Sequence, residues 1–312
     1  MKKTILATAL TSLFAATAAQ SATIYDADGV TVDVFGDSEV VILNSTAEGD
    51  STYINIDDAD FGFSLGYEFA EGYVVGTTIG FTGAGGGADL DEAYVSLMTD
   101  EFGTLKVGKQ YTFYDDSGIG NDYQFGFTAF YEQDVAGQQV VKYSIDKETF
   151  YGGIAYVMDT EAEDASVVNT NGFDAMVGLR AAGFDFTVYY ADIENANSTA
   201  GDDLSNINFE VRYAFEKLEL SASYAISEHD DPTGNNVDTN FIGAAAVYDL
   251  DENIGFAGGI ANIDPDADDS YLSGYVNTTY TFNDYVNVYA EVGYSDADDE
   301  GLGFATGMQV AF

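Results

Sequence analysis

Apolar and polar residues alternate one by one over most of the chain. Residues 218–224 read Leu-Glu-Leu-Ser-Ala-Ser-Tyr and residues 286–294 read Val-Asn-Val-Tyr-Ala-Glu-Val-Gly-Tyr, so apolar side chains recur at every second position. A period of two predicts β-strands with one apolar and one polar face. An amphipathic helix would instead space its apolar residues three and four apart. The runs are roughly ten residues long, the length of strands that cross a bilayer at a tilt.

The connections between these runs alternate between short and long. Glu101–Gly103 and Glu216–Lys217 are tight turns, whereas acidic connections rich in Gly and Asn fall near 159–171 and 193–203, and the longest spans 112–135. Short turns at one end and long loops at the other are typical of an outer-membrane barrel. The strands are expected at about 30–43, 52–58 or 59–69, 73–82, 91–98, 104–111, 137–145, 149–158, 172–181, 184–192, 204–215, 218–227, 237–250, 254–263, 270–282, 285–294 and 302–312.

These segments, about sixteen in number, predict an all-β fold: a transmembrane antiparallel β-barrel. An even number of strands closes the sheet and leaves no unpaired edge in lipid, where each unmet backbone group costs several kcal/mol. The alternative is a soluble β-sandwich or β-solenoid, in which the apolar faces would pack against each other. Neither soluble fold explains why short turns and long loops alternate, so the barrel is the favoured prediction.

The first residues have the pattern of an export signal. Lys2 and Lys3 precede an apolar stretch over 5–16, and Ala19-Gln20-Ser21 supplies small residues where a signal peptidase would cleave. The stretch is shorter than the roughly 20 residues that a transmembrane helix needs. We therefore expect residues 1–21 to be a cleavable signal peptide and residues 22–312 to form a single barrel domain.

Charge is the unusual feature of the composition. The 312 residues include 54 acidic and 9 basic side chains, for a formal net charge of −45, and no Cys. A nucleic-acid partner is excluded, because its phosphates require Lys and Arg. The absence of Cys excludes disulfides and thiolate metal sites. The acidity would repel anions from any cavity that it lines; it could equally serve to keep the protein soluble in a saline habitat, and the composition leaves both readings open.

The sequence contains no motif typical of a catalytic or metal-binding site. The one histidine, His229, lies beside acidic loop residues without a nucleophile that could pair with it, so an outer-membrane phospholipase or protease is disfavoured and we expect no enzyme activity. Asp264, Asp266 and Asp268 have the spacing of a calcium loop, but Asp269 stands where that loop needs Gly. No cofactor and no dedicated metal site are expected.

Three segments carry a resemblance to a known family. Ile24–Gly29 followed by Val32–Gly36 resembles the N-terminal strand of the general trimeric porins of the Gram-negative outer membrane. Ala93–Leu97 with Glu101–Gln110 is similar to their hairpin before the third loop. The chain ends on Phe312 in an alternating strand, which resembles the signal that the family's assembly machinery reads.

The resemblance implies a sixteen-stranded homotrimer in which the third loop, here 112–135, folds into the lumen and narrows it. In the family, acidic groups on that loop face Lys and Arg on the wall. Here acids stand at three of the wall positions, Ala136 stands near a fourth, and Gln124 replaces a loop acid. The predicted pore-lining residues are Asp37, Asp60, Asp91, Asp115, Asp116, Asp122, Gln124, Glu132 and Asp134.

The alternation itself also assigns wall acids to the lumen. Asp37 lies opposite Val34 in parity, Asp60 lies opposite Phe61, and Asp91 lies on the other side from Tyr94. A charge facing lipid at the bilayer midplane costs about 2–4 kcal/mol for Lys or Arg and less for Asp or Glu. These carboxylates are therefore expected to face water inside the barrel. The same parity places three basic residues inside, where they would offset or pair with acids: Lys106, Arg180 and Arg212.

Rings of Asp and Glu select cations. Together with the resemblance, this predicts a cation-selective general diffusion channel in the outer membrane, surrounded by lipid and open to small hydrophilic solutes. Two alternatives stay open. A substrate-specific channel would need a line of lumenal aromatic residues, and those at Phe35, Tyr189, Tyr275 and Tyr289 are scattered. An adhesin or receptor barrel would carry its binding sites in the loops, which the sequence does not weigh.

Overall fold

The computed structural model describes residues 21–83, 87–120, 123–127, 136–158, 169–196, 199–234, 236–266 and 268–312. The expected signal peptide therefore lies outside the described residues, apart from Ser21. No described helix has the length and apolar character needed to cross a membrane.

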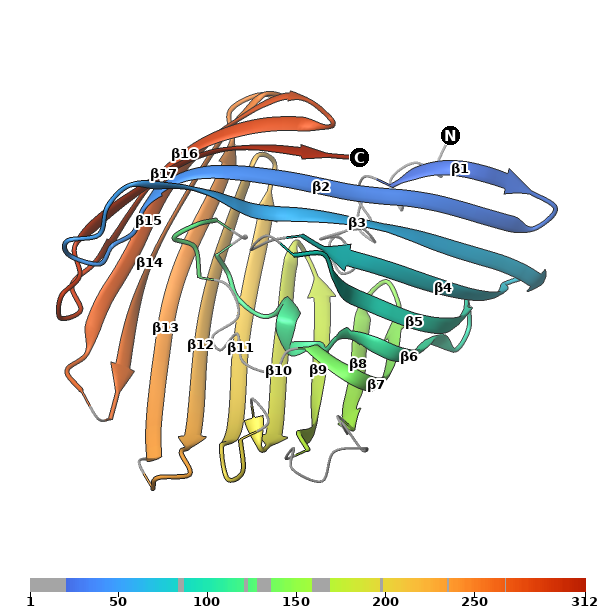
Figure 1. Ribbon diagram of the computed structural model, residues 1–312, viewed down its shortest axis with the longest axis horizontal. Helices are drawn as coiled ribbons and strands as arrows, with labels where there is room; N and C mark the ends of the chain where they lie inside the picture. The colour runs from blue at the N-terminus through green and yellow to red at the C-terminus, as the bar shows by residue number, and fades with distance from the viewer. Residues whose placement is uncertain are drawn as a thin grey trace.

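A single antiparallel sheet makes up almost the whole molecule and curves round on itself (Figure 1). Within the described ranges, every strand from β2 to β17 pairs with the next one in the chain, and β17 pairs back onto β2. These sixteen strands close the barrel, so the predicted fold class is confirmed. The elements are β1 (Ala22–Ala27), β2 (Val30–Asn44), β3 (Tyr53–Ala70), β4 (Tyr73–Thr82), β5 (Asp89–Thr99), β6 (Gly103–Tyr111), the 3₁₀ helix η2 (Tyr114–Asp116), β7 (Ala136–Asp146), β8 (Phe150–Met158), β9 (Asn171–Ala181), β10 (Phe184–Glu194), β11 (Asp203–Phe215), β12 (Leu218–Asp230), β13 (Asn236–Asp249), β14 (Ile254–Pro265), β15 (Tyr271–Asn283), β16 (Val286–Ser295) and β17 (Leu302–Ala311).

The short strand β1 was not predicted as a separate element. An Asp28-Gly29 turn, with φ of 57° and 76°, folds β1 back onto β2, which is the backbone that a two-residue hairpin turn requires. β1 pairs with Val30–Val34 of β2 and β17 pairs with Asp37–Asn44 of the same strand. Between them, the backbones of Gly36 and Phe312 exchange hydrogen bonds of 3.0 and 2.8 Å. The first and last described strands, β1 and β17, thus share one edge of β2.

The two faces of the wall follow the predicted alternation. Large apolar side chains point outward and are exposed, for example Ile242 at 59%, Ile260 at 58% and Val276 at 61%. Polar side chains of the same wall point inward and are buried, for example Asn208 at 1% and Glu291 at 2%. A soluble sandwich would bury the apolar faces instead, so this arrangement suits a barrel with lipid outside and polar groups inside.

Candidate functional site in the lumen

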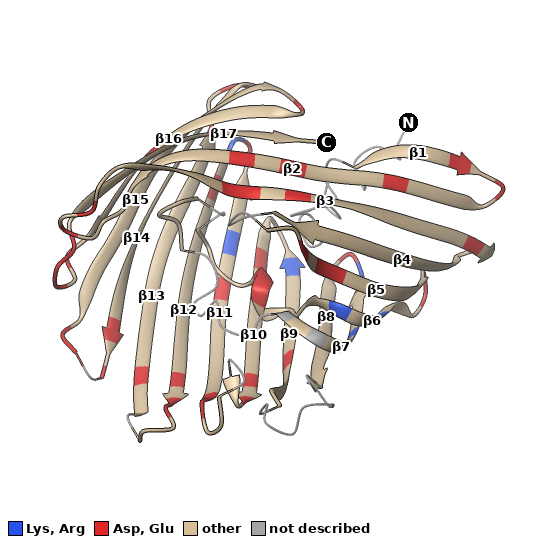
Figure 2. Cartoon of the chain, viewed as in Figure 1, with Lys and Arg blue, Asp and Glu red and all other residues tan. Residues whose placement is uncertain are grey.

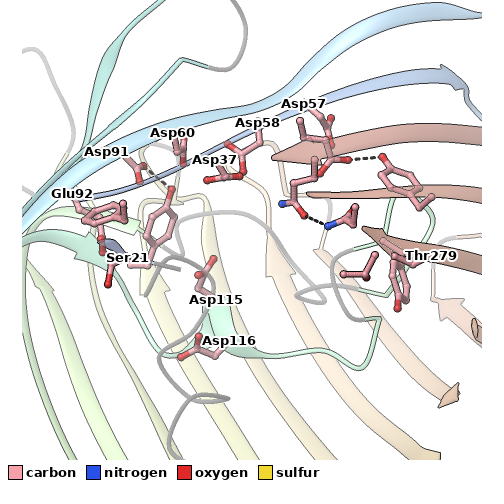
Figure 3. A pocket seen from close by; sticks show the side chains of 18 of the residues that line it. Ser21, Asp37, Asp57, Asp58, Asp60, Asp91, Glu92, Asp115, Asp116 and Thr279 are labelled. Carbon is pink, nitrogen blue, oxygen red and sulfur yellow. Dashed lines mark hydrogen bonds between the residues drawn. The ribbon is translucent and has the colours of Figure 1, made fainter. Parts of the chain in front are cut away.

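Acidic residues, most of them from the three wall strands β2, β3 and β5, line one cavity of about 1040 Å³ inside the barrel (Figure 3). The strands β2 and β3 are neighbours in the wall, and β4 separates β3 from β5. Their contribution to the cavity is Asp33, Asp37, Glu39, Asp57, Asp58, Asp60, Asp91 and Glu92. The acidic positions of Figure 2 gather visibly along β2 and β3 in this part of the sheet.

A β-bulge in β3 increases the number of acids that face the lumen. Glu39 pairs with Asp58 but the next residue of β2 pairs with Ile56, which leaves Asp57 as the extra residue. An extra residue reverses the parity of the strand. Ile56 is exposed on the outer face before the bulge and Phe61 is exposed there after it. As a result, the neighbouring residues Asp57 and Asp58 both line the cavity.

A second β-bulge, in β5, also increases the number of acids that face the lumen. Gly80 of β4 pairs with Glu92 and Phe81 pairs with Leu90, so Asp91 is the extra residue. Both Asp91 and Glu92 line the cavity, and the Tyr111 hydroxyl donates a 2.7 Å hydrogen bond to Asp91. Two separate bulges therefore each bring a pair of consecutive acids to the same space.

Three of the wall carboxylates lie very close together. Oxygens of Asp37, Asp58 and Asp60 all fall within 4.8 Å of one another. Two like charges about 4 Å apart repel by about 1 kcal/mol in water and about 4 kcal/mol at an effective dielectric constant of about 20. A cation that enters this cluster relieves the repulsion, so the arrangement favours occupancy by positive charge over negative charge.

The described part of the predicted third loop adds acids from another direction. Asp115 and Asp116, in η2, line the same cavity and lie across it from Asp37 and Asp60 in Figure 3. The wall holds η2 in place, because buried Asp174 of β9 accepts a 2.6 Å hydrogen bond from the backbone N–H of Tyr114.

Further along, residues 118–120 and 123–127 contact inward-facing side chains of the wall. Glu210 of β11 accepts a hydrogen bond from the N–H of Gly118, and Glu291 of β16 accepts one of 2.6 Å from the N–H of Phe125. Gln124 donates its side-chain N–H to Asp57. The described parts of the 112–135 connection are thus fixed to wall strands far away in sequence.

Lys106 and Lys142 also line this cavity, and the basic residues of the lumen make hydrogen bonds and ion pairs of their own. The Lys142 ammonium donates to the backbone carbonyls of Tyr111 and Thr112, both at 3.1 Å, and Lys106 donates to the Tyr94 hydroxyl at 3.1 Å. Arg180 of β9 pairs with Asp146 at 2.8 Å and Asp185 at 3.3 Å. On β11, the Arg212 guanidinium lies 3.3 Å from Glu219 and 3.7 Å from Glu210.

Most of the residues singled out from the sequence meet at this cavity. Asp122, Glu132 and Asp134 lie outside the described residues, and so does the side chain of Ala136. Phe312 directly follows β17 and has a half-exposed side chain. The predicted residues that line the cavity are Asp37, Asp60, Asp91, Asp115, Asp116 and Gln124.

The parity argument was wrong for one residue and incomplete for others. Tyr94 was placed on the outer face, but it lines the cavity beside Lys106; Asp91 reaches the same side only because of the bulge. Asp57, Asp58 and Glu92 were missed. The sequence does hold a signal for the bulge in β3, since the alternation of apolar residues changes phase at Asp57.

The comparisons with known proteins agree with this architecture. The sequence profile of the family described as Gram-negative porin matches residues 7–300. The chain belongs to the Gram-negative porin family. Porin-like protein H of Photobacterium profundum is 29% identical over 334 residues, covering all of both chains. Family membership confirms the resemblance and makes the protein a porin of the outer membrane, in a family of channels rather than enzymes.

Solved structures share the fold at lower identity. A loop L8 deletion mutant of OmpT, an outer membrane protein of Vibrio cholerae, has a TM-score of 0.79 at 20% identity and covers 91% of this porin and 100% of its own chain. The anion-selective porin from Comamonas acidovorans has a TM-score of 0.75 at 17% identity, with coverage of 91% and 100%. An anion-selective channel has the same fold, so the fold alone does not determine whether cations or anions pass. The charge preference of a porin must therefore depend on its lumenal side chains.

Proposed function

We propose that this porin is a general diffusion channel for small hydrophilic solutes and ions, and that it prefers cations. The observation that carries the proposal is the lining of the lumenal cavity, where the described residues include two lysines and thirteen acidic side chains, the ten named above together with Asp249, Asp251 and Glu252. Clefts lined by one sign of charge concentrate ions of the opposite sign, and carboxylate rings select cations.

The acids that face each other across the cavity also favour cations over anions. In the general trimeric porins that the sequence resembles, basic wall residues face acidic loop residues. Here the wall positions opposite Asp115 and Asp116 carry Asp37 and Asp60. An anion crossing the cavity would thus meet negative charge from both sides, and a cation would be attracted from both.

We also propose that the connection 112–135 narrows the lumen. Its described residues place acids and Gln124 at the cavity, and their backbone is held by buried carboxylates of the wall. A segment fixed in this way sets a defined opening, so an ion passing it comes within a few ångströms of fixed charges. At physiological ionic strength charges are screened over about 8 Å, so charges at such distances still act.

The remaining expectations about the mature protein belong to the same proposal. We expect a homotrimer, because the sequence resembles trimeric porins, with lipid against the outward apolar faces. A native mass measurement in detergent that gave a monomer would argue against the trimer. We expect cleavage of residues 1–21 during export, which N-terminal sequencing of the membrane-inserted protein tests directly.

Reversal potentials across planar bilayers test the selectivity. In a salt gradient the purified porin should give the potential of a cation-preferring pore, and the double variant Asp37→Lys with Asp60→Arg should lose much of that preference. Asp268→Asn, a substitution in an exposed loop, is the control and should behave like the parent. An anion-directed potential for the parent protein would refute the proposal. A size cut-off measured with sugars in liposomes tests general diffusion separately.

A further inference from the structure

Two glycines form a gap in the inner face of the wall. Gly293 of β16 and Gly303 of β17 are direct register partners on adjacent strands, and both are buried on the inward face. A glycine inside a strand often marks a place where another group comes very close to the backbone. Here that group is the ring of Phe125. A Cβ atom on Gly303 would lie 2.7 Å from the ring's Cζ, and one on Gly293 would overlap its Cγ.

The backbone of Phe125 is fixed at the same place. Its N–H donates a 2.6 Å hydrogen bond to Glu291, two residues before Gly293 on β16. Glu291 is 2% exposed, and its other carboxylate oxygen accepts a 3.0 Å bond from Asn277. The ring and the backbone amide of Phe125 are therefore both held by the wall.

A second aromatic residue of the same segment repeats this arrangement. Phe127 lies against Gly259 of β14, where a Cβ would come within 2.7 Å of the ring. Its ring makes edge-to-face contacts with Phe241 and Tyr275, with centroids 5.8 and 5.3 Å apart. The Phe127 carbonyl accepts a 2.6 Å hydrogen bond from Gly120. The ring of Phe125, inside the turn 123–126, and the ring of Phe127, just after it, are thus both held against the wall.

Gln124 connects the Phe125 site to the acidic residues of β3. It precedes Phe125, lines the cavity, and donates to Asp57 at the bulge of β3. In the sheet, β2 lies between β17 and β3. Residues 124–125 therefore reach from the glycine pair on β16 and β17 to the acidic strand β3. The position of the Phe125 ring therefore determines where Gln124 meets the acids.

We propose that Gly293 and Gly303 form a seat for the Phe125 ring, and that this seat positions Gln124 against Asp57 and so fixes the width and charge of the ion path. Gly293 and Gly303 are then positioning residues that act on permeation without touching the ions. The inference rests on the proposed function, since it concerns the same lumen.

The test compares Gly293→Ala and Gly303→Ala with Gly66→Ala in single-channel recordings. At Gly66, an inward position of β3, an added Cβ would meet no atom closer than 3.4 Å, so this control should keep the parent conductance. The two seat variants should change the open conductance by about twofold or split it into several levels. The chain has no Cys, so a Gln124→Cys background offers a second readout. The rate at which a cationic thiol reagent modifies that cysteine should change in the seat variants and stay constant in the control.

Phe125→Ala removes the ring without adding atoms to the wall, so it tests the proposal even if an alanine in the seat prevents folding. It should change the conductance by itself, and Gly293→Ala should add little to it, because residues that act through one contact are not additive. Parent conductance in Phe125→Ala, or independent effects of the two substitutions, would overturn the proposal. A parent channel that proved anion-selective would instead count against the proposed function and leave these conductance comparisons valid.

Discussion

Removing one carboxylate from the Asp37, Asp58 and Asp60 cluster should lower the cation preference by an amount that depends on salt. Oxygens of the three lie within 4.8 Å of one another, and we take the same distance for an ion that passes Asp58. Two unit charges at 4.8 Å interact by about 0.9 kcal/mol in water. Screening over about 10 Å in 0.1 M salt leaves about 0.5 kcal/mol, and screening over about 3 Å in 1 M salt leaves about 0.2 kcal/mol.

The variant Asp58→Asn keeps the shape of the side chain and loses its charge. It weakens the attraction for a cation and the repulsion of an anion by the same amount, so the ratio of their permeabilities changes by twice this energy. The expected fall is about fivefold to sixfold in 0.1 M salt and about twofold in 1 M salt.

Reversal potentials of the parent, Asp58→Asn and the loop control Asp268→Asn measure this ratio at pH 8, where unperturbed carboxyl groups are ionised. Each protein is recorded at both salt concentrations. An unchanged ratio in 0.1 M salt would mean that ions do not pass near the cluster. An equal loss at both salt concentrations would mean that the effect is steric rather than electrostatic.

Three further predictions follow from the same structure. Lowering the pH from 8 to 4 should reduce the cation preference, because carboxylates carry their charge above their pKa and lose it as the pH falls through it; a pH-independent reversal potential would contradict this. Arg180→Met should lower the unfolding temperature, seen as the heat-induced shift on a gel, since it removes the guanidinium that pairs with Asp146 and Asp185 and leaves Asp185 only the hydroxyl of Tyr151 among its described partners, at a cost of about 1–3 kcal/mol. A parent-like unfolding temperature would show that the pairs contribute nothing. Phe312→Ala should reduce the amount of assembled barrel in the outer membrane, while the same variant refolded in detergent should still close through its backbone bonds to Gly36; normal assembly in cells would remove the role inferred from the family.

The alternation of side chains was enough to predict the wall, and it failed where the backbone departs from strict pairing. The sequence placed the second strand at either 52–58 or 59–69, and the apolar positions change phase between these two ranges. The structure has one strand across both segments, with Asp57 as the extra residue of a bulge. A turn and a bulge change the phase of a strand in the same way, so the pattern alone cannot separate them. Tyr94 was misplaced for the same reason, since its parity was counted across the bulge at Asp91.

The contacts of the loop segment were beyond the reach of sequence patterns. Phe125 and Glu291 are 166 residues apart, and Gly118 and Glu210 are 92 apart. The residues on the wall are ordinary inward-facing positions in sequence, and only the curvature of the closed sheet brings them to the loop. The family resemblance predicted that a long loop enters the lumen, but it named no partner on the wall.

The few basic residues explain how so acidic a lumen can keep a defined structure and still carry unbalanced charge. Arg180 and Arg212 are each paired with acids of other wall strands, and Lys142 binds the carbonyls at the start of the loop segment. Their positive charge is thus used where it holds strands and loop together, and within the described residues no ion pair joins it to Asp37, Asp58 or Asp60. An anion-selective porin has the same fold, so under the proposed function the preference of this porin would depend on a few lumenal side chains and on the two bulges that turn additional acids inward.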